Sequence, residues 1–272
     1  MLKERLENVR RLRPLIHSIT NYVTVNDCAN ALLACGASPI MSDDATEVEE
    51  ITSLCAGLNI NIGTLNTRTI PSMLLAGKKA KELCRPVVLD PVGAGASRLR
   101  TETALRILNE VEPDIIRGNV SEIKSLAGGR GSTKGVDADT AESITDESLE
   151  GMAEFAKGFA AKTGAVIVMT GATDIVADSK RVFTIKNGTP MMSLVTGTGC
   201  MLSAVTAAYA AANREDMTLA AVAAVCLMGL SGERAFEGLR GRGSASLRNG
   251  IIDNIYNISG DMLEEGARYG LR

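Results

Sequence analysis

Two short stretches of the chain, 86–89 and 165–169, are almost wholly apolar. A strand that is apolar at every position has no face for water, which is typical of a parallel sheet covered by helices on both sides. Strand-like segments also alternate with segments of helical spacing along most of the chain. This alternation predicts an α/β fold of three layers, with a mainly parallel central sheet between two layers of helices.

Further strands are expected at 15–19, 38–41, 58–62 and 114–117. Helical spacing predicts helices at 21–35 with Gly36 as the stop, 45–55, 67–84, 98–111, from near Ser121, 146–162, and almost continuously after 196. Segments 174–178 and 181–186 alternate polar and apolar residues around a turn, which indicates an antiparallel edge hairpin. A glycine-rich loop is expected at 128–136. With no repeat and no linker, residues 1–272 are expected to form a single domain without a lid domain.

Composition narrows the class of protein. With 45% apolar and 22% charged residues, the chain is expected to be a soluble globular protein with an ample core. A formal net charge of -3 and the lack of a dense Lys/Arg face argue against a nucleic-acid partner. The longest apolar run, 217–230, is too short to cross a bilayer and indicates a buried helix, so no membrane partner is expected. Residues 1–13 lack the apolar core of a signal peptide, which favours a cytoplasmic protein, and the six cysteines form no Cys-x-x-Cys pair that would suggest zinc.

The segment 196–200, Thr-Gly-Thr-Gly-Cys, separates an apolar run from an alanine-rich helical pattern. Its two glycines let the backbone turn tightly, so that several N–H groups at the start of the helix point to one place. The positive end of the helix dipole adds to the same place, which therefore suits an anion. The alternative is a plain loop in which Cys200 is a small buried apolar residue.

Polar residues follow three of the predicted parallel strands at their carboxyl ends, where open α/β sheets bind ligands. Asp90 follows the first apolar strand, Thr170 follows the second, and Arg117 leads to Asn119 and Glu122. Two carboxylates with a guanidinium, an amide and a hydroxyl at one edge suit a magnesium-bound polyphosphate. Each residue taken singly also has an ordinary alternative, as a turn residue, a surface charge or part of the first turn of a helix.

The better-known phosphate loops are absent, because neither glycine-rich turn has the third glycine of a dinucleotide-binding loop and no Gly-x-x-x-x-Gly-Lys-[Ser/Thr] occurs. Other motifs occur in a fixed order over nearly the whole chain: His-Ser-Ile-Thr-Asn at 17–21, Pro-Ile-Met at 39–41, Asp-Pro-Val-Gly-Ala-Gly at 90–95, Arg-Gly-Asn-Val-Ser-Glu at 117–122, Met-Thr-Gly at 169–171 and Gly-Thr-Gly-Cys at 197–200. In these motifs the chain resembles the hydroxyethylthiazole kinase family, thiamine-salvage enzymes of the ribokinase-like superfamily. The resemblance implies a ribokinase-like fold and phosphorylation of the hydroxyl of 4-methyl-5-(2-hydroxyethyl)thiazole by Mg-ATP.

The resemblance also implies which residues meet the thiazole. Met41 and Gly197 would contact this substrate, and Asn21 and Val23 would line its pocket. Cys200 stands where sugar kinases of the superfamily usually carry Asp, and it would face the substrate hydroxyl. The catalytic turn would be completed by the backbone of Gly197, Thr198 and Gly199, which would hold the anion as it forms.

For the nucleotide, the resemblance implies that Arg117 and Thr170 bind ATP, with Asn119 beside them. Asp90 and Glu122 would hold Mg²⁺ directly or through water. A homotrimer with its active sites at the subunit interfaces is implied as well, and the lack of any strand left over for a lid fits this expectation, because something must exclude water from the site.

Two other classes of function remain open beside a kinase for the thiazole or for another vitamin precursor. An ATP- or ADP-dependent dehydratase that repairs hydrated nicotinamide nucleotides would have the same fold, but would carry Asp in place of Cys200. A non-catalytic nucleotide-binding regulator would not need Asp90, Glu122 and Arg117 all at once. His17, the only histidine, is expected to be structural and not a catalytic base.

Overall fold

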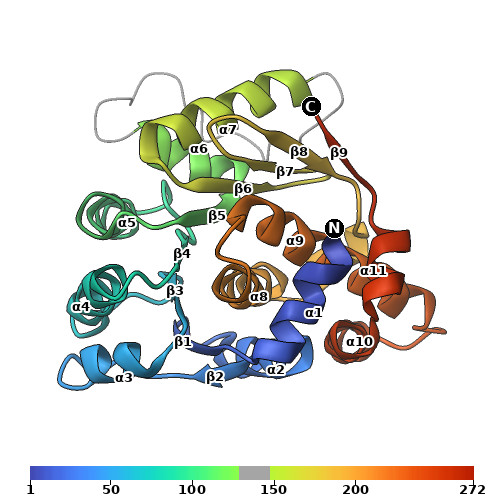
Figure 1. Ribbon diagram of the computed structural model, residues 1–272, viewed down its shortest axis with the longest axis horizontal. Helices are drawn as coiled ribbons and strands as arrows, with labels where there is room; N and C mark the ends of the chain where they lie inside the picture. Colours follow the sequence, from blue (N-terminus) through green and yellow to red (C-terminus); the bar gives the residue numbers. More distant parts are fainter. Residues whose placement is uncertain (129–147) are drawn as a thin grey trace.

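The computed structural model describes residues 1–128 and 148–272, so the glycine-rich loop expected at 128–136 and the expected helix start at 146 lie largely outside the described residues. One nine-stranded sheet runs through the protein (Figure 1). Its strands are β1 (Leu15–Ile19), β2 (Ser38–Ile40), β3 (Gly57–Asn61), β4 (Val87–Asp90), β5 (Ile115–Asn119), β6 (Val166–Thr170), β7 (Asp174–Ala177), β8 (Val182–Ile185) and β9 (Tyr269–Leu271). They lie in the order β2-β1-β3-β4-β5-β6-β7-β8-β9. The pairs from β2 to β6 are parallel, and those from β6 to β9 are antiparallel.

Helices cover both faces of this sheet, as expected for three layers (Figure 1). One layer consists of α3 (Val48–Leu54), α4 (Thr69–Glu82), α5 (Arg98–Val111), α6 (Val120–Gly128) and α7 (Leu149–Thr163). The other consists of α1 (Leu2–Leu12), α2 (Val25–Cys35), α8 (Thr198–Ala212), α9 (Met217–Glu237), α10 (Ser244–Asn257) and α11 (Gly260–Gly266). A short 3₁₀ helix, η2 (Pro190–Leu194), leads into α8.

The apolar strands explain why two layers of helices are needed. Val88 of β4 packs into the core with α8 and α9, whereas its neighbours Val87 and Leu89 pack into the core with α4 and α5. Ile115 and Ile116 of β5 divide between the two cores in the same way. Successive side chains of a strand point to opposite faces, so a continuous apolar run fills both cores at once.

Most predicted elements are present, and the antiparallel hairpin is confirmed as β7 and β8. Two expectations need correction. Helix α2 begins at Val25 and not at 21, because the Asn21 side chain accepts hydrogen bonds from Thr24 N at 3.2 Å and Thr24 Oγ1 at 3.1 Å and so stabilises a turn. The region after 196 is not helical to its end, because β9 pairs with β8 and forms the last strand of the sheet.

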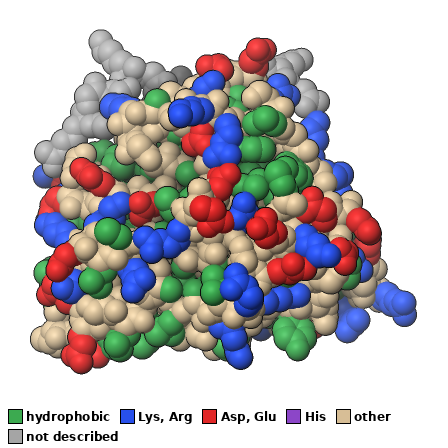
Figure 2. Space-filling view, viewed as in Figure 1, with side chains coloured by type: hydrophobic (Ala, Val, Ile, Leu, Met, Phe, Trp, Pro, Cys, Tyr) green, Lys and Arg blue, Asp and Glu red, His purple; other side chains and the backbone are tan. Residues whose placement is uncertain are grey.

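The apolar run at 217–230 lies in α9, as expected for a buried helix. By length and composition α9 could cross a membrane, but 83% of its apolar window is buried inside the protein. It packs on α8 and α10, which explains its hydropathy as that of a core helix. On the face seen in Figure 2, basic and acidic side chains are interspersed.

Helix α1 supplies a stability prediction, since Leu2, Leu6 and Val9 are buried against the core while Leu12 is 51% exposed. Leu6→Ala should lower the free energy of unfolding by about 2–5 kcal/mol, because it leaves a cavity in a packed core. Leu12→Ala removes the same atoms from the same helix and should change it by less than about 0.5 kcal/mol. Urea unfolding of both variants measures the difference, and equal losses would contradict the packing of α1 described here.

Candidate active site

The carboxyl ends of β4, β5 and β6 bring three of the expected site residues together. Arg117 Nη2 donates a hydrogen bond to Thr170 Oγ1 at 2.8 Å, and Arg117 Nη1 lies 3.6 Å from Asp90 Oδ2. The guanidinium is mostly buried, with 11% of the side chain exposed. A cation therefore links the ends of three neighbouring strands.

Asp90 ends β4, and its side chain is completely buried. Its Oδ2 accepts hydrogen bonds from Asn61 Nδ2 at 2.8 Å and from Ser203 Oγ at 2.7 Å. Its Oδ1 is buried without a hydrogen-bond partner among residues 1–128 and 148–272. Burial raises the pKa of Asp90 to about 6; the Arg117 charge opposes this shift and the Glu122 charge adds to it.

Glu122 is fixed at the start of α6 by backbone donors. Its Oε2 accepts a hydrogen bond from Asn119 N, and its Oε1 accepts one from Gly93 N, each at 2.8 Å. In return, Asn119 Oδ1 accepts a hydrogen bond from Glu122 N at 2.8 Å, which completes a reciprocal cap at the helix start. The Asn119 side chain is thus occupied by the helix, and Glu122 is held beside the loop that follows Asp90.

The first turn of α8 approaches this cluster closely, and two glycines make the approach possible. Gly197 caps the helix with φ +87°, and a Cβ atom there would lie 2.4 Å from Thr24 Cγ2. A Cβ atom on Gly199 would lie 2.4 Å from Arg117 Nη1. A side chain at Gly197 would push the turn away from Thr24, and one at Gly199 would displace either the turn or the Arg117 guanidinium.

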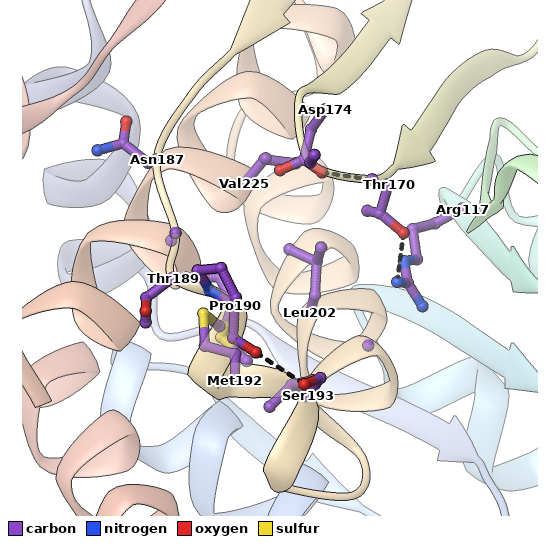
Figure 3. A pocket seen from close by; sticks show the side chains of 17 residues that line it. Arg117, Thr170, Asp174, Asn187, Thr189, Pro190, Met192, Ser193, Leu202 and Val225 are labelled. Carbon is purple, nitrogen blue, oxygen red and sulfur yellow. Dashed lines mark hydrogen bonds between the residues drawn. The ribbon is translucent and has the colours of Figure 1, made fainter. Parts of the chain in front are cut away.

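A cavity of about 530 Å³ opens between β6, the segment 187–193, α8 and α9 (Figure 3). Arg117 and Thr170 lie at one end of it, with Thr198 and Gly199 of the α8 turn also in the wall. Much of the remaining wall is apolar, with contributions from Pro190, Met192, Leu202, Val225 and Met228. This volume is in the range of small-molecule and cofactor sites. A cation and free backbone N–H groups at one end and aliphatic walls at the other suit a nucleotide.

Asp174 of β7 also lines this cavity, and no sequence motif indicated it. Its Oδ1 accepts a hydrogen bond from Gly171 N at 2.9 Å (Figure 3). Burial raises the pKa of Asp174 to about 7, against the lowering effect of the Gly171 hydrogen bond and the Arg117 charge. Asp174 is therefore an ionisable group in the cavity wall, beside Val225 (Figure 3).

Cys200 lies on the other side of the α8 turn, and two asparagines hold its sulfur. Asn21 Nδ2 and Asn61 Nδ2 each donate to Cys200 Sγ at 3.2 Å. Asn61 and Ser203 were missed by the sequence reasoning, which treated both as ordinary positions in a strand and a helix. The signal available for Asn61 was the pair of amides, Asn59 and Asn61, inside an otherwise apolar strand.

The remaining expected substrate residues lie outside the cavity. Met41 packs at the edge of the core that contains α8, and Val23, next to the turn at Asn21, is 58% exposed. His17 is fully buried, with Nε2 2.9 Å from Ser42 O and Nδ1 2.9 Å from Thr52 Oγ1. Burial lowers the pKa of His17, and these two contacts fit the structural role expected for it.

Comparison with known proteins gives a consistent result. The model of the hydroxyethylthiazole kinase family matches residues 6–261. A hydroxyethylthiazole kinase of Clostridium acetobutylicum is 62% identical over 270 residues, which cover 99% of each chain. The solved structure of a Pyrococcus horikoshii OT3 hydroxyethylthiazole kinase matches with a TM-score of 0.89 at 36% identity, over 100% of this chain and 98% of that one. A ribokinase-like superfamily protein of Enterococcus faecalis, at 13% identity and a TM-score of 0.62 over 94% and 89% of the two chains, shares the fold. The expected ribokinase-like fold is thereby confirmed, and the chain belongs to the hydroxyethylthiazole kinase family.

Proposed function

We propose that this protein transfers the γ-phosphoryl group of ATP to the hydroxyl of 4-methyl-5-(2-hydroxyethyl)thiazole, a step of thiamine synthesis and salvage. The observation that carries the proposal is the position of the first turn of α8. Thr198 and Gly199 of this turn line the nucleotide-sized cavity, while the next residue, Cys200, contacts Asn21 and Asn61 on the other side. A phosphoryl donor in the cavity and an alcohol beside Cys200 would meet at this turn.

On the nucleotide side, Arg117 is the group suited to neutralise phosphate oxygens. Its guanidinium already lies at the cavity wall and donates to Thr170, a residue that would share the phosphate contacts. The backbone N–H groups at the start of α8, from Gly197 to Gly199, are free of helical partners and would stabilise negative charge on the transferred group. Asn119 would act mainly by holding Glu122 in place.

Asp90 and Glu122 fit a magnesium ion that accompanies ATP. Oxygen donors are what Mg²⁺ prefers, Asp90 Oδ1 has no hydrogen-bond partner among the described residues, and the Glu122 charge raises the pKa of Asp90. An Asp90 carboxylate disfavoured in this way by a neighbouring charge gains from a cation near it. A bound Mg²⁺ would supply charge neutralisation for the triphosphate, with phosphate oxygens and water completing its coordination.

On the acceptor side, we assign the thiazole to the region of Asn21, Val23, Met41 and Gly197. Cys200 is assigned as the group that accepts the hydroxyl proton. As the new O–P bond forms and the bond between the γ-phosphorus and ADP breaks, that proton would pass to the Cys200 thiolate, which becomes a thiol. The transition state of such transfers is loose, so positioning and charge neutralisation matter more than the strength of the base.

The function is tested by incubating the protein with ATP and Mg²⁺ and a panel of thiazole, pyrimidine and sugar alcohols, and following ADP release. Turnover is expected with hydroxyethylthiazole, because the acceptor site is assigned to that alcohol. A chelator such as EDTA should abolish it, and added Mg²⁺ should restore it. Turnover with no alcohol would favour the dehydratase or regulator interpretation, and turnover that survives the chelator would contradict the metal assignment.

Substitutions of Cys200 test its role. Cys200→Ala and Cys200→Ser should lose about 10- to 1000-fold in kcat, the order of effect expected of a general base. Cys200→Asp should keep activity or raise it, because a carboxylate can accept both the substrate proton and the two amide hydrogen bonds. Steady-state kinetics of the three variants measure this. A folded Cys200→Asp protein that binds the thiazole but does not turn it over would contradict the general-base assignment.

We further propose a cytoplasmic homotrimer with the acceptor pocket at the subunit interface. Tyr22 and Val23 are 78% and 58% exposed beside Asn21, and the described residues form one sheet with no second sheet to cover this side. Cell fractionation would test the proposed cytoplasmic localisation.

Assembly should therefore be coupled to activity. Val23→Asp is expected to weaken the trimer and to lower turnover together, since it puts a carboxylate into an apolar contact. Sedimentation velocity at assay concentration, beside turnover at the same concentration, measures both properties. A wild-type protein that is fully active as a monomer would rule the proposal out.

A further inference from the structure

Asn61 ends β3 inside the protein, with 1% of its surface exposed, between the two halves of the site. Its Nδ2 lies 2.8 Å from Asp90 Oδ2 and 3.2 Å from Cys200 Sγ. Its Oδ1 accepts hydrogen bonds from Asn21 Nδ2 at 3.0 Å and from Gly63 N at 2.9 Å. One buried amide therefore contacts the carboxylate assigned to the metal, the sulfur assigned as base, and the second asparagine that holds that sulfur.

These partners fix which way the Asn61 amide points. If the amide were flipped, its oxygen would face Asp90 Oδ2 and its NH₂ group would face the N–H of Gly63, so an acceptor would meet an acceptor and a donor would meet a donor. In the orientation found, both N–H bonds of Asn61 are used, one toward Asp90 and one toward Cys200. Asn21 is fixed similarly, because its oxygen accepts from Thr24 and its NH₂ group serves Asn61 and Cys200.

We propose that Asn61 is a positioning residue for phosphoryl transfer, and that it acts through Cys200. This inference rests on the kinase function proposed above. Two N–H donors, from Asn61 and Asn21, hold the sulfur from the protein side and keep it at a fixed place relative to Asp90. A lone pair of the sulfur, as thiolate, is left for the substrate hydroxyl; it accepts that proton and becomes a thiol while the alcohol oxygen bonds to phosphorus and ADP leaves.

Asp90 depends less on Asn61 than Cys200 does. Asp90 Oδ2 also accepts a hydrogen bond from Ser203 Oγ and lies near Arg117, and both contacts persist without Asn61. Of the two hydrogen-bond donors that Cys200 Sγ has among the described residues, it would keep the Asn21 amide. Asn21 itself would lose one acceptor, Asn61 Oδ1, and with it part of its own orientation. Loss of the Asn61 side chain should therefore disturb the position of Cys200 Sγ more than that of the Asp90 carboxylate.

A kinetic double-mutant cycle tests this. Asn61→Ala should lower kcat for the thiazole by about 10- to 100-fold in the wild-type background, because proton acceptance by a misplaced group is slow. In the Cys200→Ala background the same substitution should lower kcat by less than about threefold, since the sulfur that Asn61 positions is absent. The KM for ATP should stay within about threefold in both, because Asn61 does not line the nucleotide cavity. Radiolabelled ATP keeps the slow variants measurable.

Asn59→Ala is the matched control, since Asn59 lies two residues earlier in the same strand, is equally buried, and donates its Nδ2 hydrogen bond to Ser18 Oγ at 3.0 Å. It should leave kcat within about threefold of wild type. Asn61→Leu, which keeps the branched shape of the side chain but has no N–H, should reproduce the loss seen with Asn61→Ala and replaces it if the smaller side chain unfolds the protein.

The outcomes separate the two proposals. Wild-type protein that does not phosphorylate the thiazole would remove the kinase function before any variant is compared. With an active wild type, an equal loss from Asn61→Ala in both backgrounds, or a loss from Asn59→Ala as large as that from Asn61→Ala, would overturn the assignment of Asn61 as a group that acts through Cys200.

Discussion

The carboxyl group of Asp90 lies fully buried at the end of a central strand, and the site is arranged around it. An ionised carboxylate is costly to bury unless it is paired and hydrogen-bonded. Arg117 of β5, Asn61 of β3 and Ser203 of α8 provide these interactions. Because Ser203 is one turn into α8, its hydrogen bond to Asp90 also fixes how far the helix start lies from the sheet. Gly199 can then approach Arg117 only because it has no side chain.

The fold was largely predictable because its strongest signals are local. Helix α5 occupies the range expected from its pattern, since Ser97 caps its start by accepting a hydrogen bond from Arg100 N and Glu112 leaves the helix in a left-handed conformation. The start of α2 and the presence of strand β9 were not predictable from local patterns. The first depends on an asparagine side chain that replaces helical hydrogen bonds, and the second is a three-residue strand that exists only because β8 offers an edge.

The candidate site was only partly predictable. Asp90, Arg117 and Thr170 could be placed together because a parallel sheet brings the carboxyl ends of its strands to one edge. The contribution of β3 could not be foreseen, since its alternation of leucine or isoleucine with asparagine is typical of a strand with one face in water. In the structure every residue of β3 is buried, because α8 covers the asparagine face. The segment 187–193 shows neither helical nor strand periodicity of its apolar residues, so its pattern indicates no regular element. It forms part of the cavity wall because α9 packs against it.

The first turn of α8 separates the nucleotide-sized cavity from the Asn21 and Cys200 side by the thickness of a single backbone segment. Thr24 packs against Gly197 on one side of it, and Arg117 packs against Gly199 on the other. Most residues assigned to the alcohol follow β1 and β2, with Gly197 added at the start of α8, whereas those that line the cavity come from β5 onward. The acceptor half of such a protein can therefore diverge in evolution toward new alcohols while its nucleotide half stays unchanged. Redesign of the acceptor pocket should likewise begin at Asn21, Val23 and Met41 in the N-terminal part of the chain and leave Gly197 and Cys200 of the α8 turn unchanged.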